Sequence, residues 1–224
     1  MLQLIIDGKT DEETLQLADD AINAGCRWLQ LCPSLITSAA DSDNIREEYK
    51  EMVEKLIPTA RDNDVFLMIE DDVDLVEATH VHGVVVRDGS RGNLLAVRER
   101  MGAEAVIGAY VPNFDQALEL RNVDVDYLLV PAPAEADPMA FYKDFSDKLY
   151  NAGLDIHLVA AGDFAADQLP QLLTAGCAGV ALTIPDSFRI AMEEKPLNEA
   201  VAKAVEILAN HREALNAAIT GETK

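Results

Sequence analysis

The feature that most constrains the fold is a repeat of short apolar runs separated by segments with helical periodicity. Eight such runs begin at Leu2, Trp28, Val65, Gly83, Ala105, Tyr127, His157 and Gly179. Their starts are 18 to 37 residues apart, which is enough for a strand and the crossover helix that a parallel sheet requires. The runs are almost continuously apolar, which is typical of strands that are buried on both faces.

The segments between the runs carry an apolar stripe at helical spacing. The stripe is clearest in the last segment, at Leu197, Ala200, Val201, Ala204, Val205 and Leu208. Thr10 and Glu13 have the spacing of a helix N-cap, and Gly25 and Gly153 lie where helices should end. Because no linker or compositional break interrupts residues 1–224, the sequence predicts an α/β protein with a single (β/α)8 TIM barrel. A doubly wound open sheet is the alternative, since periodicity does not show closure.

Charge and cysteine content argue against several classes of protein. The chain has 40 Asp and Glu against 18 Lys and Arg, a net charge of −22, which disfavours binding to nucleic acid or to an anionic membrane surface. No run approaches the roughly 18 apolar residues of a membrane span, and no basic leader precedes the first strand. Cys26, Cys32 and Cys177 have no disulfide or zinc spacing. We therefore expect a cytoplasmic protein.

The residues that follow the predicted strands are mostly acidic, and in TIM barrels this end of the strands holds the active site. They are Asp7, Glu70, Asp71, Asp72, Asp88, Asp163 and Asp186. Carboxylates that converge on one mouth repel one another unless some are protonated or a cation is present, so Mg2+ or a cationic organic ligand is predicted there. Helix capping is the alternative role of these aspartates.

The loops after the seventh and eighth strands are the usual phosphate site of such barrels, through their backbone N–H groups. Gly162 and the segment from Thr183 to Ser187 occupy these places. The nearest cations that the order of the chain offers are Arg87, Arg91 and Arg189. Gly162 could equally be a turn glycine.

Other reactive side chains have plain structural interpretations. Cys32 ends the second strand without a histidine nearby in the predicted order, so we expect a small buried residue. His80 and His82 precede the fourth strand, at the amino end of the barrel, where a metal site is not expected. Trp28 opens the second strand and is expected in the core or the barrel wall.

The ordered series of short motifs resembles the thiamine phosphate synthase and TenI family. The motifs are IEDDVDL from Ile69, GVVV from Gly83, IGA from Ile107, DY from Asp126, VAAGD from Val159 and AGCAGVA from Ala175. The resemblance covers nearly the whole chain and implies the same barrel. Enzymes of this family join a pyrimidine pyrophosphate to a thiazole phosphate with Mg2+, which gives thiamine phosphate and pyrophosphate. The resemblance therefore implies a small phosphorylated or heterocyclic ligand for this chain.

Two motifs show what this chain keeps and what it replaces. The family's Q-L-R-x-K motif, which binds pyrophosphate, reads QLCPS at residues 30–34, so the glutamine stays and both cations are replaced. The family's I-N-D-D motif reads IEDD at residues 69–72, which keeps the Mg2+ ligand Asp71 and replaces the asparagine by Glu70. The candidate phosphate-binding residues are thus Gln30, Gly162 and Thr183, and the candidate metal ligands are Asp71 and Glu70. No catalytic residue is assigned.

Further departures occur downstream. The family's G-x-H-x-G-Q-x-D reads GVVVRDGS from Gly83, its S-x-H reads Tyr110-Val111-Pro112, and its T-x-T-K loop has no counterpart in residues 131–138. Each lost cation removes about 1.5–3 kcal/mol of charge-assisted hydrogen bonding, so we predict reduced or lost synthase activity. The alternative is a non-catalytic or regulatory barrel whose acidic mouth binds a metal or an amine. An apolar patch on an outer helix would allow a homodimer.

Overall fold

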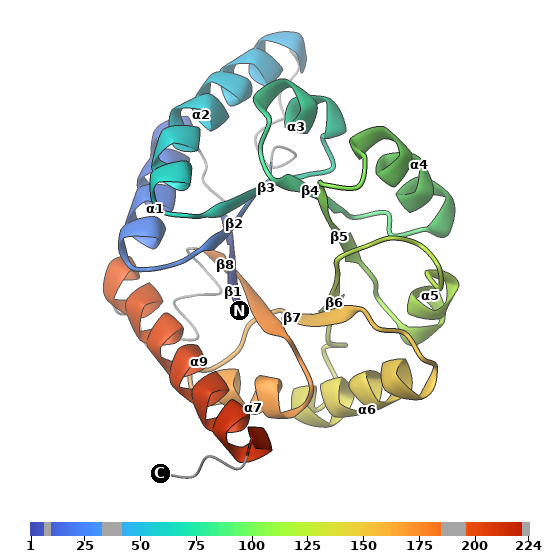
Figure 1. The fold of residues 1–224 in the computed structure, drawn as a ribbon. Coiled ribbons are helices and arrows are strands. Elements are labelled where there is room, and N and C mark those ends of the chain that lie inside the picture. Colours follow the sequence, from blue (N-terminus) through green and yellow to red (C-terminus); the bar gives the residue numbers. More distant parts are fainter. Residues whose placement is uncertain (7–9, 33–41, 185–195, 221–224) are drawn as a thin grey trace.

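The computed structural model describes residues 1–6, 10–32, 42–184 and 196–220, and its eight strands close into a parallel barrel (Figure 1). The strands are β1 (Leu2–Ile6), β2 (Trp28–Leu31), β3 (Phe66–Glu70), β4 (Gly83–Val86), β5 (Val106–Tyr110), β6 (Tyr127–Pro131), β7 (His157–Ala161) and β8 (Gly179–Ile184). Each strand pairs in parallel with the next, and β8 pairs with β1. This last pairing confirms the predicted TIM barrel and excludes the open sheet.

The helices form the outer ring in Figure 1. Those described are α1 (Asp11–Asn23), α2 (Ser42–Asp62), α3 (Val73–Thr79), α4 (Arg91–Met101), α5 (Phe114–Glu119), α6 (Pro138–Asn151), α7 (Gln168–Thr174) and α9 (Leu197–Thr220). The predicted N-cap of α1 is present, because Thr10 Oγ1 accepts a hydrogen bond from Glu13 N–H at 3.1 Å. Gly25 and Gly153 lie just past α1 and α6 with positive φ angles, as expected of glycines that end helices.

The alternation of side chains along each strand gives the molecule two apolar layers. On β1, Leu2, Leu4 and Ile6 belong to the larger layer between the strands and the helices. The opposite face of the strands fills the barrel interior, with Ile5, Cys32, Met68, Val85, Tyr127, Leu129, Val159, Ala161 and Ala181. Both faces are therefore buried, which explains why the strand sequences lack a polar alternation.

Two glycines in neighbouring strands leave room for other parts of the barrel wall. A Cβ atom on Gly83 would lie 1.9 Å from the carbonyl oxygen of Val106. A Cβ atom on Gly108 would lie 2.4 Å from Cζ of Tyr127, whose ring crosses the interior at this level. These positions need glycine because backbone or a buried ring occupies the space of a side chain.

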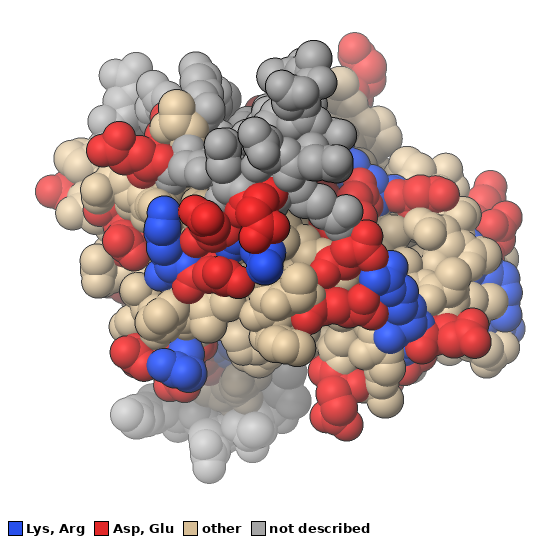
Figure 2. Space-filling view, turned by 90° about the horizontal axis from the view of Figure 1, so that it is seen from above, with Lys and Arg blue, Asp and Glu red and all other residues tan. Residues whose placement is uncertain are grey.

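Figure 2 shows one side of the molecule, where acidic side chains outnumber basic ones and most basic side chains adjoin acidic ones. This distribution agrees with the net charge of −22 and with the surface ion pairs, such as Arg100 with Asp74 and Glu77. Within the described ranges, no helix combines the length and the apolar character that crossing a bilayer requires.

Candidate functional site

A cluster of polar side chains occupies the barrel interior at the carboxyl ends of the strands. Its members come from consecutive strands: Gln30 on β2, Cys32 just after β2, Glu70 at the end of β3, Arg87 just after β4 and Tyr110 at the end of β5. Glu70 pairs in register with Val85, a residue of the interior layer, and therefore faces inward. Arg87 follows Val85 by two residues and lies on the same face.

Glu70 is the centre of this cluster, and its side chain is buried with 1% exposed. Its Oε2 accepts hydrogen bonds from Gln30 Nε2 at 2.5 Å and from Cys32 Sγ at 3.2 Å, and its Oε1 accepts one from Arg87 Nε. A buried carboxylate is tolerated only when it is paired and hydrogen-bonded. Both oxygens of Glu70 meet that condition through residues of this chain.

Arg87 links the buried carboxylate to the mouth. Its side chain is 56% exposed, and its Cζ lies 6.0 Å from the ring centroid of Tyr110. Burial works against the charge of Arg87, but the hydrogen bond and the charge of Glu70 outweigh it and raise the pKa of the guanidinium. Burial, with the charge of Glu70 added, raises the pKa of Tyr110 to about 12. The mouth therefore holds a permanent cation whose charge is balanced by Glu70, beside a neutral phenol.

Cys32 is buried, as expected. Burial raises the pKa of its thiol, and the neighbouring Glu70 carboxylate raises it further. The thiol therefore stays protonated at neutral pH and donates to Glu70. Nucleophilic cysteines have lowered pKa values in electropositive surroundings, so this environment is that of an unreactive thiol.

The three successive acidic residues 70–72 have separate partners. Asp71 is exposed, and its Oδ1 accepts a hydrogen bond from the backbone N–H of Arg87 at 2.8 Å. Asp72 caps α3, with its Oδ1 accepting from Leu75 N–H at 2.9 Å. Asp72 therefore has the alternative role predicted for these aspartates, which is helix capping. Among the residues that the structure describes, no group of three or more His, Cys, Asp or Glu side chains is arranged to hold a metal ion.

The predicted phosphate-binding residues lie on three neighbouring parts of the barrel. Ile5 on β1 pairs in register with Gln30 on one side and with Thr183 on the other, so these two polar residues flank β1 at one level. Gln30 is fully buried beneath Glu70, and Thr183 is half-buried. Gly162 follows β7 with φ +153°, and its N–H donates to the carbonyl of Ala181 at 3.3 Å. That amide is therefore already engaged within the barrel wall.

Other candidates from the sequence lie elsewhere. Arg91 donates from Nη1 to the carbonyls of Glu119 and Arg121, and so ties α4 to the end of α5. Asp88 accepts from Ser90 N–H at 3.2 Å within the turn that leads into α4. Several candidates lie outside the described residues: Asp7, Pro33, Ser34, Asp186, Ser187 and Arg189.

The polar cluster extends further into the barrel than the sequence suggested. Gln3 is completely buried on β1, and its Nε2 donates to Gln30 Oε1 at 2.7 Å and to Tyr127 Oη at 3.3 Å. A continuous chain of polar groups thus runs from Tyr127 through Gln3 and Gln30 to Glu70. The available signal was a glutamine inside each of two otherwise apolar strands.

Comparison with known proteins decides the family. A family model described as thiamine monophosphate synthase matches residues 2–184. The chain belongs to this family. Among curated members, the thiamine-phosphate synthase of Natronomonas pharaonis is 30% identical over 179 residues, which cover 75% of this chain and 78% of that protein. The thiamine-phosphate synthase of Bacteroides fragilis is 23% identical over 193 residues, which cover 81% and 89%.

A solved structure supports the fold of this thiamine monophosphate synthase family member. The thiamine phosphate pyrophosphorylase from Pyrococcus furiosus superposes with a TM-score of 0.74 at 20% identity, over 94% of this chain and 96% of that one. At this identity the similarity shows the shared barrel.

Two departures from the family motifs contact each other in the structure. Glu70 stands where the third-strand motif has asparagine, and Arg87 stands where the fourth-strand motif has its second glycine. The Arg87 guanidinium bonds the Glu70 carboxylate across the β3–β4 pair. The added negative charge and the added positive charge therefore neutralise each other in one ion pair.

Proposed function

We propose that this chain is a thiamine phosphate synthase-type barrel that binds a small phosphorylated or heterocyclic molecule at its carboxyl mouth, with reduced or lost synthase activity. The Glu70–Arg87 ion pair is the observation that carries this proposal. Within the described residues, the polar cluster is contacted by one basic side chain, that of Arg87. The positive charge of Arg87 is already balanced by the Glu70 carboxylate.

The synthase reaction needs cations because a pyrophosphate leaves with its negative charge. In this sequence the arginine and lysine of the second-strand motif are Cys32 and Ser34, and the sixth-strand lysine has no counterpart. Cys32 does not replace the lost arginine, since it holds a neutral thiol that donates to Glu70. Each missing charge-assisted hydrogen bond is worth about 1.5–3 kcal/mol, so the loss of two of these three cations is already enough to lower the rate by roughly 10²–10⁴-fold.

Mg2+ is proposed as the accompanying ion, and Asp71 and Glu70 differ in how well they fit it. Glu70 does not fit, because the Arg87 guanidinium lies on its Oε1 and two further donors lie on its Oε2. Asp71 fits, because it is exposed beside the mouth and engages Arg87 N–H through Oδ1. One carboxylate with phosphate oxygens and water is a usual Mg2+ ligand set. Bound there, the ion would neutralise part of the charge of a phosphate group.

The remaining groups of the mouth suit binding better than catalysis. Arg87 bonds Glu70 through Nε, which leaves its other N–H groups on the exposed side of the guanidinium. Thr183 lies on β8 in register with Ile5, a residue of the interior layer, and is half-buried there. Gln30 contributes indirectly, since both ends of its amide are bonded within the barrel and hold Glu70 in place.

The proposal is tested by thermal-shift titration with thiazole phosphate, thiamine phosphate and pyrophosphate, each with and without Mg2+. A ligand at 100 times its Kd adds about 2.7 kcal/mol, which should raise Tm by roughly 5–10 °C in a chain of this size. We expect a shift with thiazole phosphate or thiamine phosphate that is lost in Arg87→Ala and kept in Arg61→Ala, which removes an exposed arginine of α2. No shift with any ligand would overturn the proposed binding at the mouth.

A further inference from the structure

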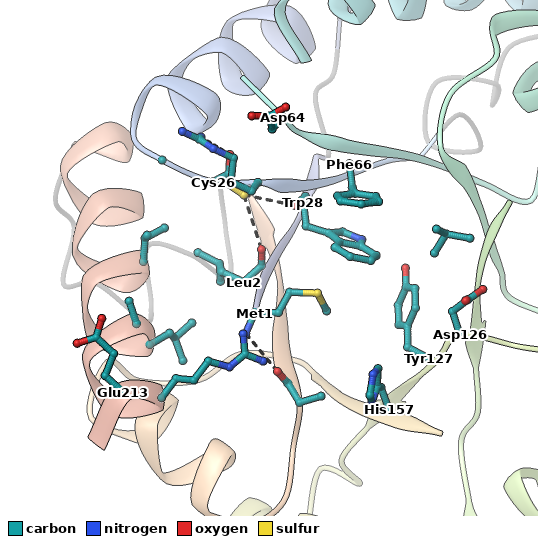
Figure 3. Close-up of a pocket in the computed structure, with 18 of the residues that line it drawn as sticks. Met1, Leu2, Cys26, Trp28, Asp64, Phe66, Asp126, Tyr127, His157 and Glu213 are labelled. Carbon is teal, nitrogen blue, oxygen red and sulfur yellow. Dashed lines mark hydrogen bonds between the residues drawn. The ribbon is translucent and has the colours of Figure 1, made fainter. Parts of the chain in front are cut away.

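Two glutamine side chains are completely buried inside the barrel, Gln3 on β1 and Gln30 on β2. Gln30 contacts Glu70 at the mouth, and Gln3 contacts Tyr127, which lines a cavity of about 870 Å³ at the amino end of the barrel (Figure 3). A glutamine amide has a donor end and an acceptor end, so its nitrogen and its oxygen need different partners. The neighbours of the two amides therefore determine the direction of each.

The direction of the Gln30 amide is set by Glu70. The carboxylate of Glu70, which is paired with Arg87, can only accept hydrogen bonds, and its Oε2 lies 2.5 Å from the end of the Gln30 side chain. The group at that end must be the amide nitrogen, because two oxygens at this distance would repel each other. The oxygen of Gln30 then faces Gln3, whose Nε2 donates to it at 2.7 Å.

The Gln3 amide keeps one unpaired atom in this arrangement. Its Nε2 also donates to Tyr127 Oη at 3.3 Å, while its Oε1 is buried and has no hydrogen-bond partner in the described part of the chain. Buried polar atoms are rarely left unpaired. Turning the amide around would bring Oε1 to the Tyr127 hydroxyl, but it would also set this oxygen against the oxygen of Gln30. The direction of the Gln3 amide is therefore imposed from the mouth.

Tyr127 holds the other side of Gln3. Its ring occupies the space that Gly108 leaves, and it meets the ring of Trp28 edge-on with centroids 5.5 Å apart. Figure 3 shows these two rings side by side at the amino-end cavity, which Phe66 also lines. Burial raises the pKa of Tyr127, so its hydroxyl stays neutral and can accept from Gln3. Gln3 is thus fixed between a packed ring and the amide of Gln30.

We infer that Gln3 is a positioning residue for the mouth, which holds the nitrogen of the Gln30 amide toward Glu70. The Gln30 amide then stabilises the buried carboxylate together with Arg87 and the Cys32 thiol. If Gln30 turned, Glu70 would depend more on Arg87, which would become less available to an anionic ligand. This consequence for ligands rests on the proposed function of the mouth, whereas the direction of the Gln30 amide does not.

Side-chain ¹H–¹⁵N signals of the full chain, recorded without ligand, report the direction of the amide. We expect a Gln30 amide proton downfield of those of free glutamine side chains, because its bond to the carboxylate is short and charge-assisted. The signal is assigned by its loss in Gln30→Met. Gln3→Met, which removes the donor and keeps the length of the side chain, should move it toward the free position. Gln16→Met, the same change at an exposed glutamine of α1, should leave it in place.

A double-mutant cycle separates positioning from packing. Gln3→Met should weaken the binding of Mg2+-pyrophosphate about threefold, measured by calorimetry. In a Glu70→Gln background the same change should alter Kd by less than about 1.5-fold, because the carboxylate through which Gln3 acts is gone. A role of Gln3 in packing alone would give equal changes in both backgrounds.

Equal changes in the two backgrounds, or a Gln30 amide proton at the free position in the parent protein, would overturn the inference. If Gln3→Met does not fold, the Gln3 amide protons of the parent protein test the same contact, since one of them should shift in Gln30→Met. An unchanged Gln3 signal in that variant would also overturn the inference. If the parent protein binds no pyrophosphate, the proposed function of the mouth is in question, and the ligand-free amide signals still decide the role of Gln3.

Discussion

The guanidinium of Arg87 and the carboxylate of Glu70 form an ion pair between the ends of β4 and β3, with Glu70 buried and Arg87 half-exposed. Both residues depart from the motifs of the thiamine monophosphate synthase family, and each is the partner of the other. An isolated Glu70 would be a buried, uncompensated charge, and an isolated Arg87 would be a free anion-binding group. The pair therefore compensates the buried charge of Glu70, and in the function proposed above it weakens the mouth as a phosphate site.

Replacing Glu70 by Gln should make Arg87 available to anions. We expect Mg2+-pyrophosphate to bind Glu70→Gln about three- to tenfold more tightly than the parent protein, measured by isothermal titration calorimetry. Glu77→Gln is the matched control, because it removes the same charge from α3, where Glu77 forms an exposed ion pair with Arg100 of α4. If the two variants change Kd equally, net charge rather than release of Arg87 explains the effect.

Acidification should destabilise the protein in part through His82. Burial lowers the pKa of His82 below its usual 6.5, and its Nδ1 accepts a hydrogen bond from Leu67 N–H at 3.1 Å. Because the unfolded chain then binds a proton more readily, the contribution of His82 to the free energy of unfolding falls as the pH drops below about 6.5.

We would measure the unfolding free energies of the parent protein and of His82→Gln in urea. Lowering the pH from 7.5 to 5 should reduce the unfolding free energy of the parent protein more than that of the variant. His157→Gln, which changes an exposed histidine of the same end of the barrel, serves as the control. A difference that does not vary with pH would contradict this account of His82.

The three thiols should be unreactive in the native protein. Burial raises the pKa of Cys26 to about 11 and of Cys177 to about 12, and burial with the charge of Glu70 raises that of Cys32. Since the thiolate is the reactive form, we expect none of them to react with Ellman's reagent within minutes at pH 8, and all three to react in guanidinium chloride. A rapid native reaction that Cys32→Ser abolishes would show an accessible thiolate at the mouth.

Glycine at position 83 should be essential for the barrel wall. Gly83→Ala places a methyl group against the backbone of β5, with 1.9 Å to the carbonyl oxygen of Val106, and should destabilise the protein by about 2 kcal/mol or more. Gly92→Ala is the control, because nothing lies within 4 Å of its added Cβ and alanine favours helix α4 by up to about 1 kcal/mol. Equal free energies of unfolding for the two variants would contradict the packing described for Gly83.

The sequence predicted the barrel because its strands are marked by continuous apolar runs, although two of them begin one residue later than expected, at Phe66 and Val106. Closure could not be read from periodicity, since it depends on the pairing of β8 with β1. The Glu70–Arg87 pair was also out of reach, because it depends on the register of β3 against β4. Trp28 was expected in the core or wall, but nothing in the local pattern indicated the cavity that it shares with Phe66.

Turnover with the substrates of thiamine phosphate synthase decides whether the mouth of this barrel has lost its activity. Formation of thiamine phosphate from the pyrimidine pyrophosphate and thiazole phosphate with Mg2+ would be followed for this chain beside the Natronomonas pharaonis thiamine-phosphate synthase, each in its own suitable salt. We predict a kcat/KM at least about 100-fold lower for this chain, as the loss of two of the three missing cations alone implies. A kcat/KM within about tenfold of that enzyme would show that the remaining residues of the mouth suffice, and would contradict the account.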